Sequence, residues 1–200
     1  MEASWQGKPI ILASSSPRRQ ELLQTLGCPF EVVVPSVDEG ALERAGGAGP
    51  GTAVEEISRR KVAAVAPRFP GRVVVGADTV VVLDGRVLGK PQGPDDAVRM
   101  LEALSGRWHS VYTGLAVRGA HSSRIQTRHV RTDVRFRNLE PAWIRRYVET
   151  GEPLDKAGAY GIQGRGALFV AEIRGCYFTV VGLPLAALSE MLEAEGVSLL

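Results

Sequence analysis

The sequence predicts an α/β fold, because strand-like and helix-like patterns alternate along its 200 residues. Short apolar runs rich in Val, Ile and Leu are separated by segments whose apolar residues recur at helical spacing. The chain is 44% hydrophobic and 23% charged, which is typical of a globular protein with a sizeable core. No apolar run approaches the roughly 20 residues of a membrane-spanning helix. The net charge of +2 is too small to indicate nucleic-acid binding by itself.

In the first half of the chain, each expected helix begins with a recognisable signal. Ser16 is a good N-cap and Pro17 a good first helical residue, while Thr52 and Glu55 match a capping box. Asp84-Gly85 predicts a type I′ hairpin turn. We therefore expect strands at 9–13, 30–35, 72–83 and 87–88, and helices at 17–26, 52–65 and 94–104.

The second half continues the alternation around one glycine-dense stretch, Asp155 to Gly166. No linker is long enough to force two independent domains, so residues 9–200 are predicted to form a single domain. Residues 1–8 are interpreted as an N-terminal extension and a candidate for disorder; they lack the features of a secretory signal. We expect strands at 110–118, 128–137, 167–173 and 177–181, and helices at 141–149 and from Pro184 onward.

The first candidate site follows the first strand, where Ser14, Arg18 and Arg19 flank the predicted helix start. A helix N-terminus favours an anion through its backbone N–H groups and its dipole. Two adjacent arginines add bidentate donors suited to phosphate. The alternative is a capped helix with two solvated arginines. The Walker A pattern is absent.

The second candidate is Asp78, which lies inside the apolar run Val73–Val82. Burying a carboxylate there costs several kcal/mol unless a cation or a metal meets it. Gly76 and Ala77 just before it are expected to leave space for a ligand. In the alternative interpretation, Asp78 begins a bulge or is satisfied by backbone N–H groups.

Two lysines could supply that cation. Lys61 falls on the apolar stripe of its helix, so it either reaches into a polar pocket or extends to the edge of the helix. Lys90 follows the hairpin, and the alternative there is an ordinary surface lysine. Asp38-Glu39 and Gln163 are further candidates, although loop acids are commonly solvated and a glutamine can simply brace a loop.

The remaining chemistry-bearing residues give weaker signals. The three histidines lack metal-ligand spacing, and no Gly-x-Ser-x-Gly elbow supports Ser-His-Asp hydrolysis. Cys28 and Cys176 are expected to be free, buried thiols in a reducing compartment, with a disulfide or a nucleophile as the alternative. The arginines of 118–137 alternate with apolar residues, which indicates a half-buried strand with a solvated face.

The order of these motifs resembles the Maf family of nucleoside triphosphate pyrophosphatases over about residues 9–190. The most specific parts are the opening Ser14-Ser15-Ser16-Pro17-Arg18-Arg19 and the strand Gly76-Ala77-Asp78-Thr79; Asp38-Glu39, Lys61, Gly89-Lys90-Pro91 and 155–164 follow in order. The resemblance implies an inosine-triphosphatase-like fold, with a long, twisted, mixed sheet flanked by helices and two lobes around a cleft. The segment Ala159-Tyr160-Gly161-Ile162-Gln163-Gly164 looks like the branch that acts on dTTP and UTP.

The resemblance also implies a role for each candidate residue. Asp78 would be the general base and, with Glu39, would hold a divalent cation, Mg²⁺ or Mn²⁺. Ser14, Arg19, Lys61 and Lys90 would contact the triphosphate, and Arg18, Thr79 and Gln163 would discriminate substrates. Cations and a helix N-terminus suit a leaving pyrophosphate, and Mg²⁺ requires hard oxygen ligands.

The implied reaction is hydrolysis of dTTP and UTP, including modified pyrimidine triphosphates, to the monophosphate and pyrophosphate. We expect a cytoplasmic homodimer without a membrane or nucleic-acid partner. Two alternatives stay open at this point. One is a 7-methyl-GTP pyrophosphatase, and the other is a regulator of cell division that binds nucleotide or nucleic acid without hydrolysis.

Overall fold

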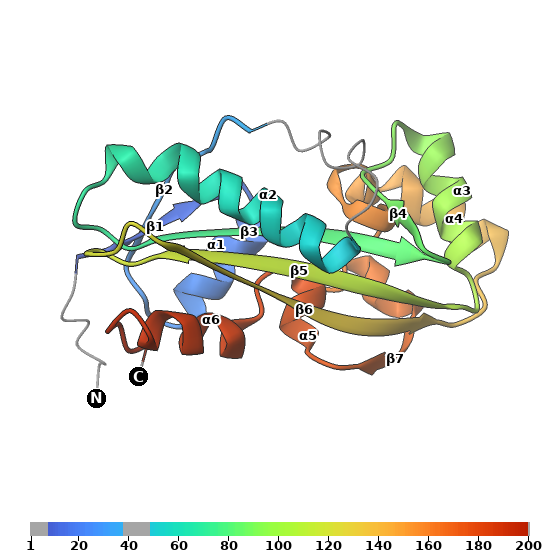
Figure 1. Cartoon of the computed structure of the whole chain (residues 1–200). Coiled ribbons are helices and arrows are strands. Elements are labelled where there is room, and N and C mark those ends of the chain that lie inside the picture. The colour runs from blue at the N-terminus through green and yellow to red at the C-terminus, as the bar shows by residue number, and fades with distance from the viewer. Residues whose placement is uncertain (1–7, 38–48, 200) are drawn as a thin grey trace. The chain divides into compact units, whose positions relative to one another are not determined.

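The computed structural model describes residues 8–37 and 49–199 (Figure 1). The chain divides into two compact units. Unit 1 comprises Met1–Asp78, Thr113–Val130 and Gly182–Leu200; unit 2 comprises Thr79–Tyr112 and Arg131–Val181. The chain therefore passes between the units four times, and the units are not successive domains. That residues 9–200 fold as a single domain stays a prediction. Asp38 and Glu39 lie outside the described residues.

One mixed sheet of seven strands confirms the predicted α/β class. The strand order is β2-β1-β3-β5-β6-β7, with β4 paired to β3 outside this path. β1 runs parallel to β2 and β3, whereas β4 and β7 run antiparallel to their partners β3 and β6. The strands are β1 Ile10–Ala13, β2 Phe30–Val32, β3 Val74–Leu83, β4 Arg86–Leu88, β5 Trp108–Arg118, β6 Ile125–Phe136 and β7 Val170–Arg174.

In unit 1, helices cover both faces of the sheet (Figure 1). α2 lies on one face, and α1 and α6 lie on the other. Alternate residues of β1 face α2: Ile11 and Ala13 join Val62 and Val65 of that helix in one buried apolar cluster. These helices span α1 Pro17–Thr25, α2 Pro50–Val65 and α6 Leu185–Glu193.

The ends of these helices test the expected start and stop signals. α1 begins with Pro17 at its first position, as expected, and Gly27 follows the helix in the left-handed region. The prediction that a capping box at Thr52 and Glu55 begins the next helix is wrong. α2 begins two residues earlier at Pro50, with Gly49 as N-cap, because proline is itself a favourable first helical residue.

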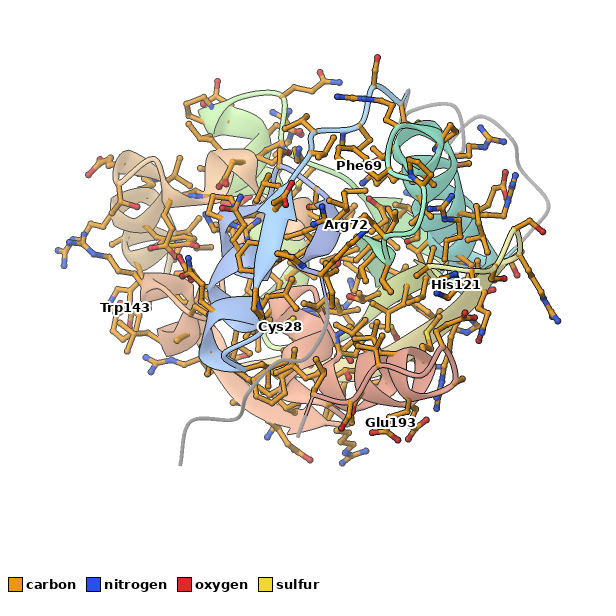
Figure 2. All side chains as sticks on the ribbon, turned by 90° about the vertical axis from the view of Figure 1, so that its left-hand side faces the viewer. Cys28, Phe69, Arg72, His121, Trp143 and Glu193 are labelled. Carbon is orange, nitrogen blue, oxygen red and sulfur yellow. The ribbon has the colours of Figure 1, made fainter. Side chains whose placement is uncertain are left out.

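The expected start of β3 at Arg72 is also wrong, since the chain turns there before the strand begins at Val74. A 3-10 helix at Ala66–Arg68 follows α2, and Gly71 adopts a φ of +68°. Arg72 instead braces the sheet edge beside β2, where its Nε donates to the carbonyl of Pro9 at 2.8 Å (Figure 2). Arg72 therefore lies in a turn before β3 and links that turn by a hydrogen bond to the residue that precedes β1.

Unit 2 contains the predicted hairpin and two predicted helices. Asp84 and Gly85 both have positive φ, of 50° and 78°, as a type I′ turn requires. The helices α3 Pro94–Leu104 and α4 Pro141–Glu149 match their expected bounds and pack against each other. Strands β5 and β6 begin earlier than expected, at Trp108 and Ile125.

The last part of unit 2 departs most from expectation. Tyr177–Val181 forms the short helix α5 rather than a strand, although its aromatic and β-branched residues favour strands. Gly175 and Gly182, which bracket α5, have φ values of 126° and 116°, so the backbone turns at both ends and tertiary context overrides propensity. The expected strand at 167–173 begins only at Val170, after a 3-10 helix at Arg165–Phe169. Further 3-10 helices lie at Glu152–Asp155 and Ala157–Ala159.

The terminal helix α6 is confirmed, with Pro184 as its N-cap. Leu188 and Leu192, one turn apart on this helix, are fully buried. Within residues 8–37 and 49–199, none of the helices combines the length and the apolarity needed to cross a membrane.

Candidate functional site

The loop between β1 and α1 presents the hydroxyl of Ser14, which is only 3% exposed. Ser14 Oγ accepts hydrogen bonds from the backbone N–H of Ser16, at 3.2 Å, and from Arg19 Nη1, at 3.0 Å. A hydroxyl that accepts two hydrogen bonds keeps its own proton as a donor. The Ser14 hydroxyl can therefore still donate a hydrogen bond, which suits a phosphate oxygen.

Arg19 braces this loop from inside the unit. It is 8% exposed, and its Nε donates to the carbonyl oxygen of Gly182 at 2.8 Å, in addition to its bond with Ser14. Two edges of the guanidinium are therefore used within the protein. Arg18 is half-buried, and the side chain of Ser16 makes no capping hydrogen bond to α1. Arg18 and Arg19 are neighbours in sequence, but Arg19 is buried whereas Arg18 is partly accessible to solvent.

Unit 1 holds a buried ion pair between α2 and β3. Lys61 Nζ lies 2.7 Å from Asp78 Oδ1 and 3.4 Å from the carbonyl oxygen of Ala77. The two residues are 4% and 8% exposed. Lys61 provides the opposite charge that a carboxylate inside an apolar strand requires. Of the two interpretations of Lys61, the structure therefore supports the one in which it reaches a polar partner inside the fold.

Glycines set the distance between α2 and the sheet. A Cβ added to Gly76 would lie 2.9 Å from Val62 Cγ2 and 3.0 Å from the carbonyl oxygen of Ser58. A Cβ on Gly114 of β5 would meet the carbonyl oxygen of Val54 at 2.3 Å. The expectation that Gly76 leaves space for a ligand is wrong, because the helix fills that space. Gly76 instead lets α2 approach closely enough for Lys61 to reach Asp78, two residues further on the same face of β3.

Unit 2 carries three of the predicted site residues, Thr79, Lys90 and Gln163. Thr79 is half-buried, and Val81, on the same face of β3, packs on the glycine-dense stretch: a Cβ on Gly158 would lie 2.9 Å from the Val81 methyl groups. The N–H of Gly158 also donates to the carbonyl oxygen of Gly89 at 3.0 Å, next to the exposed Lys90. Unit 2 thus brings the Lys90 loop and the glycine-dense stretch together.

The glycine-dense stretch has an unusual backbone. Gly158 and Ala159 are both in the left-handed region, with φ of 66° and 57°, and Ala159 is one of two non-glycine residues with positive φ in the described chain. Strained conformations of this kind concentrate at functional sites. Gln163 follows in the short segment 161–166, a turn that leads into the 3-10 helix Arg165–Phe169, and it is exposed. We call this segment the Gln163 loop.

Two residues that hold this loop were missed from the sequence. Tyr147 Oη accepts the N–H of Gly161 at 3.1 Å and donates to Glu152 Oε1 at 2.9 Å. Burial and the neighbouring Glu152 raise the pKa of Tyr147. Tyr147 falls on the apolar stripe of α4, where it resembles an ordinary core residue, and no sequence pattern marks Glu152 as its partner.

Unit 2 also buries a histidine outside the predicted set. His109 is 3% exposed, and its Nε2 lies 2.9 Å from Tyr160 Oη in the glycine-dense stretch. Burial lowers the pKa of His109 to about 4, so the ring is neutral near pH 7. Its Nδ1 is buried and has no hydrogen-bond partner among residues 8–37 and 49–199.

The cysteines and the basic strand have structural roles. Both cysteines are free; Cys28 is buried and Cys176 is half-buried, and burial raises the pKa of Cys28 to about 11, which makes its thiol a poor nucleophile. Alternate residues of β6, Thr132, Val134 and Phe136, are fully buried, as expected for a half-buried strand. Its arginines form ion pairs with Glu190, Asp133 and Glu172.

The family resemblance implies a divalent cation, and the described residues can be tested for ligands. They contain no group of three or more His, Cys, Asp or Glu side chains that could hold an ion. Asp78 engages Lys61 through Oδ1, which leaves acceptor capacity on Oδ2 for a hard cation. Asp78 therefore fits the implied cation as one oxygen ligand, to be completed by further carboxylate, phosphate or water oxygens.

A pocket of about 230 Å³ in unit 2 contains none of the predicted site residues. Tyr147, Phe169, Leu168 and Trp143 supply much of its wall. The pocket adjoins the loop that carries Gln163. Tyr147 and Arg165 line the pocket, and both also take part in hydrogen bonds that hold this loop.

Comparison with known proteins gives consistent matches along the chain. A family model described as Maf-like protein matches residues 9–195. A dTTP/UTP pyrophosphatase of Pelotomaculum thermopropionicum is 51% identical over 193 residues, which cover 96% of this chain and 100% of that protein. Proteins of the same name from Moorella thermoacetica and Symbiobacterium thermophilum are 53% and 54% identical; each match covers 94% of this chain, and 95% and 94% of those proteins. These matches extend through both units.

Proposed function

Because the chain belongs to the Maf family, we propose that it is a nucleotide pyrophosphatase that hydrolyses dTTP and UTP to the monophosphate and pyrophosphate. Relatives at about 50% identity over nearly their whole length carry this activity in their names. The observation that carries the proposal is the buried pair of Lys61 and Asp78, because it supplies a cation on α2 and a carboxylate on the apolar strand β3 within 2.7 Å of each other.

In the proposed reaction, Asp78 is the general base. It takes a proton from a water molecule, the water oxygen bonds to the α-phosphorus, and the bond from that phosphorus to the bridging oxygen breaks. The electron pair leaves with pyrophosphate. Lys61 holds the carboxylate in place at 2.7 Å and balances its charge, which leaves Oδ2 to face the water.

Negative charge develops on the leaving pyrophosphate, so preorganised donors stabilise the transition state. Ser14 donates a hydrogen bond through its hydroxyl, and Arg18, Lys61 and Lys90 provide positive charge. Arg19 acts mainly through Ser14, since its guanidinium already bonds to Ser14 and to Gly182. This division gives Arg19 a positioning role within the phosphate-binding set.

Asp78 and Glu39 are the residues we propose to hold a divalent cation, Mg²⁺ or Mn²⁺. When bound, such an ion neutralises phosphate charge and lowers the pKa of a coordinated water. The acceptor capacity that remains on Oδ2 of Asp78, beside the Lys61 bond to Oδ1, supports this assignment. For Glu39 the support is its place in the family motif.

We further propose that the nucleotide binds in a cleft between two lobes, as the family resemblance implies. Thr79 directly follows Asp78 on β3, so a residue proposed to discriminate the base is adjacent to the proposed general base. Thr79 and Gln163 would then discriminate the base, with the amide of Gln163 matching donor and acceptor positions on a pyrimidine.

We also propose that the protein is a cytoplasmic homodimer. Both cysteines of the chain are free, as is usual in a reducing compartment, and this supports a cytoplasmic protein. The family resemblance implies a homodimer. Size-exclusion chromatography with light scattering would measure its mass, and a monomer at micromolar concentration would contradict the dimer.

A substrate panel tests the proposed function. Purified protein is incubated with Mg²⁺ and dTTP, UTP, dCTP or 7-methyl-GTP, and the products are separated by chromatography. We expect dTMP and UMP with pyrophosphate as the main products. Release of orthophosphate and dTDP, preferential cleavage of 7-methyl-GTP, or no turnover would overturn the proposal. Binding to duplex DNA with a steep salt dependence, without turnover, would instead indicate the regulator.

A further inference from the structure

The loop that carries Gln163 is fixed by two side chains outside the predicted site. Glu152 accepts hydrogen bonds from the backbone N–H groups of Arg165, at 3.0 Å to Oε2, and Gly166, at 3.3 Å to Oε1. Tyr147 Oη accepts the N–H of Gly161 at 3.1 Å. The two side chains also bond to each other at 2.9 Å, and we call them the Tyr147–Glu152 clamp.

The clamp holds both ends of residues 161–166, and Gln163 lies between the anchored positions. The backbone approaches the carboxylate so closely that a Cβ on Gly164 would lie 2.3 Å from Glu152 Oε1. Lys156 adds a further tie, because its Nζ donates to the carbonyl oxygen of Glu152 at 2.6 Å. The exposed side chain of Gln163 therefore extends from a short backbone segment that the clamp holds by hydrogen bonds at both ends.

The chemistry of the clamp suits this task. An ionised carboxylate has acceptor sites for several donors, and its hydrogen bonds to N–H groups are charge-assisted. Among the described residues, the Glu152 carboxylate makes no ion pair; its partners are one hydroxyl and two backbone N–H groups. Tyr147 is 4% exposed, and its ring packs edge-on against Phe169 with centroids 4.9 Å apart, which fixes the hydroxyl.

We propose that Tyr147 and Glu152 are positioning residues for base discrimination: they fix the backbone on which Gln163 is displayed, and so set the preference between pyrimidine triphosphates. This inference rests on the proposed function, in which Gln163 contacts the base. Thymine and cytosine present opposite donor and acceptor groups at their pairing edge, so an amide can separate them only if its position is fixed.

The test uses the full-length protein with Tyr147→Phe and Glu152→Gln. The first removes only the hydroxyl, and the second keeps the shape but removes the charge. The measured quantity is the ratio of kcat/KM for dTTP to kcat/KM for dCTP, with Gln163→Ala as the reference for lost discrimination. We expect the ratio to fall about 10-fold for Glu152→Gln, and less for Tyr147→Phe, mainly through KM.

A second measurement does not depend on catalysis. Amide hydrogen exchange of peptides covering residues 160–167 should become faster in both variants, while exchange in unit 1 stays unchanged. Glu149→Gln is the matched control, since it is an exposed acid on α4 outside the clamp, and both readouts should match wild type. If Glu152→Gln fails to fold, Gly164→Ala replaces it, because the added Cβ displaces the Glu152 carboxylate while both clamp residues keep their chemical identity.

The outcomes separate this inference from the proposed function. If wild type cleaves dTTP but both clamp variants keep the wild-type ratio, or if exchange at 160–167 is unchanged, the positioning role is overturned and the proposed function stands. If wild type cleaves no nucleotide, the proposed function and the specificity role both fail. Faster exchange in the variants would then show that the clamp orders the loop without serving a pyrophosphatase.

Discussion

The two units hold their polar groups in opposite ways. Unit 1 buries charge on regular elements: Lys61 on α2, Asp78 on β3 and Arg19 on α1 are each less than a tenth exposed and are paired within the unit. Unit 2 leaves Lys90 and Gln163 exposed on irregular backbone, and orders that backbone through Tyr147 and Glu152.

This contrast suggests a division of work within the proposed enzyme. Buried charges on a strand and a helix are rigid and desolvated, which suits the proton transfer and the phosphate chemistry. The Gln163 side chain is exposed on a clamped loop, so it can be substituted without disturbing a core. Such a position suits the selection of substrate. Substitutions in unit 1 should therefore lower turnover or stability, and substitutions around Gln163 should change preference.

Asp78→Asn should have the largest effect on activity. The amide cannot accept the proton from water, so kcat for dTTP should fall about 10³-fold while nucleotide binding is retained. Steady-state kinetics and equilibrium binding measure the two quantities. Asp84→Asn, an exposed hairpin residue, is the control. Undiminished turnover in Asp78→Asn would contradict the assigned base.

Lys61→Met should have the largest effect on stability. It leaves the Asp78 carboxylate buried without its cation, which should lower the free energy of unfolding by about 3 kcal/mol, whereas adding Asp78→Asn should recover much of the loss. Arg107→Ala removes an exposed pair with Asp84 and should cost less than about 1 kcal/mol. Urea denaturation measures the free energy of unfolding of the three variants. Equal losses for Lys61→Met and Arg107→Ala would contradict the contrast between buried and exposed ion pairs.

His109 should make unit 2 sensitive to acid. Its pKa, near 6.5 when unfolded, is lowered by burial to about 4, so the stability it contributes is full above pH 6.5 and is lost as pH falls toward 4. Between pH 7.5 and 4.5 this amounts to about 2 to 3 kcal/mol. Urea denaturation at both pH values should show this component in wild type and not in His109→Leu; the exposed His121→Gln should match wild type. An identical pH dependence in His109→Leu would refute the assignment.

Gly76→Ala should have a smaller but informative effect. The added methyl group lies against Val62 and the Ser58 carbonyl, so α2 must move away from β3 at a cost of about 1 to 3 kcal/mol. Activity should fall as well, because the same movement lengthens the distance from Lys61 to Asp78. Gly71→Asn is a useful control, since Gly71 has a left-handed backbone and open space around it, and its substitution should leave turnover unchanged. Unaltered melting and turnover in Gly76→Ala would contradict the close-approach explanation.

Much of the fold was predictable from local patterns. Strand β3, the hairpin at Asp84-Gly85 and helices α3 and α4 follow from apolar runs, turn chemistry and proline starts. α5 was missed because five residues of strand-favouring character form a helix when the glycines at both ends turn the chain. Glu152 was missed because the backbone N–H groups that it accepts belong to residues 13 and 14 positions away, and no local pattern records these hydrogen bonds.

The sequence by itself determined the fold class, the family motif order and the identity of the charged residues, since these depend on residue type and spacing. It also placed Asp78 inside an apolar strand, which required a buried partner. Only the tertiary structure decided that the partner is Lys61, that Gly76 makes room for a helix rather than a ligand, and that Arg19 braces Ser14. The physical reason is that burial and pairing depend on which distant segments pack together, and spacing along one chain does not encode those contacts.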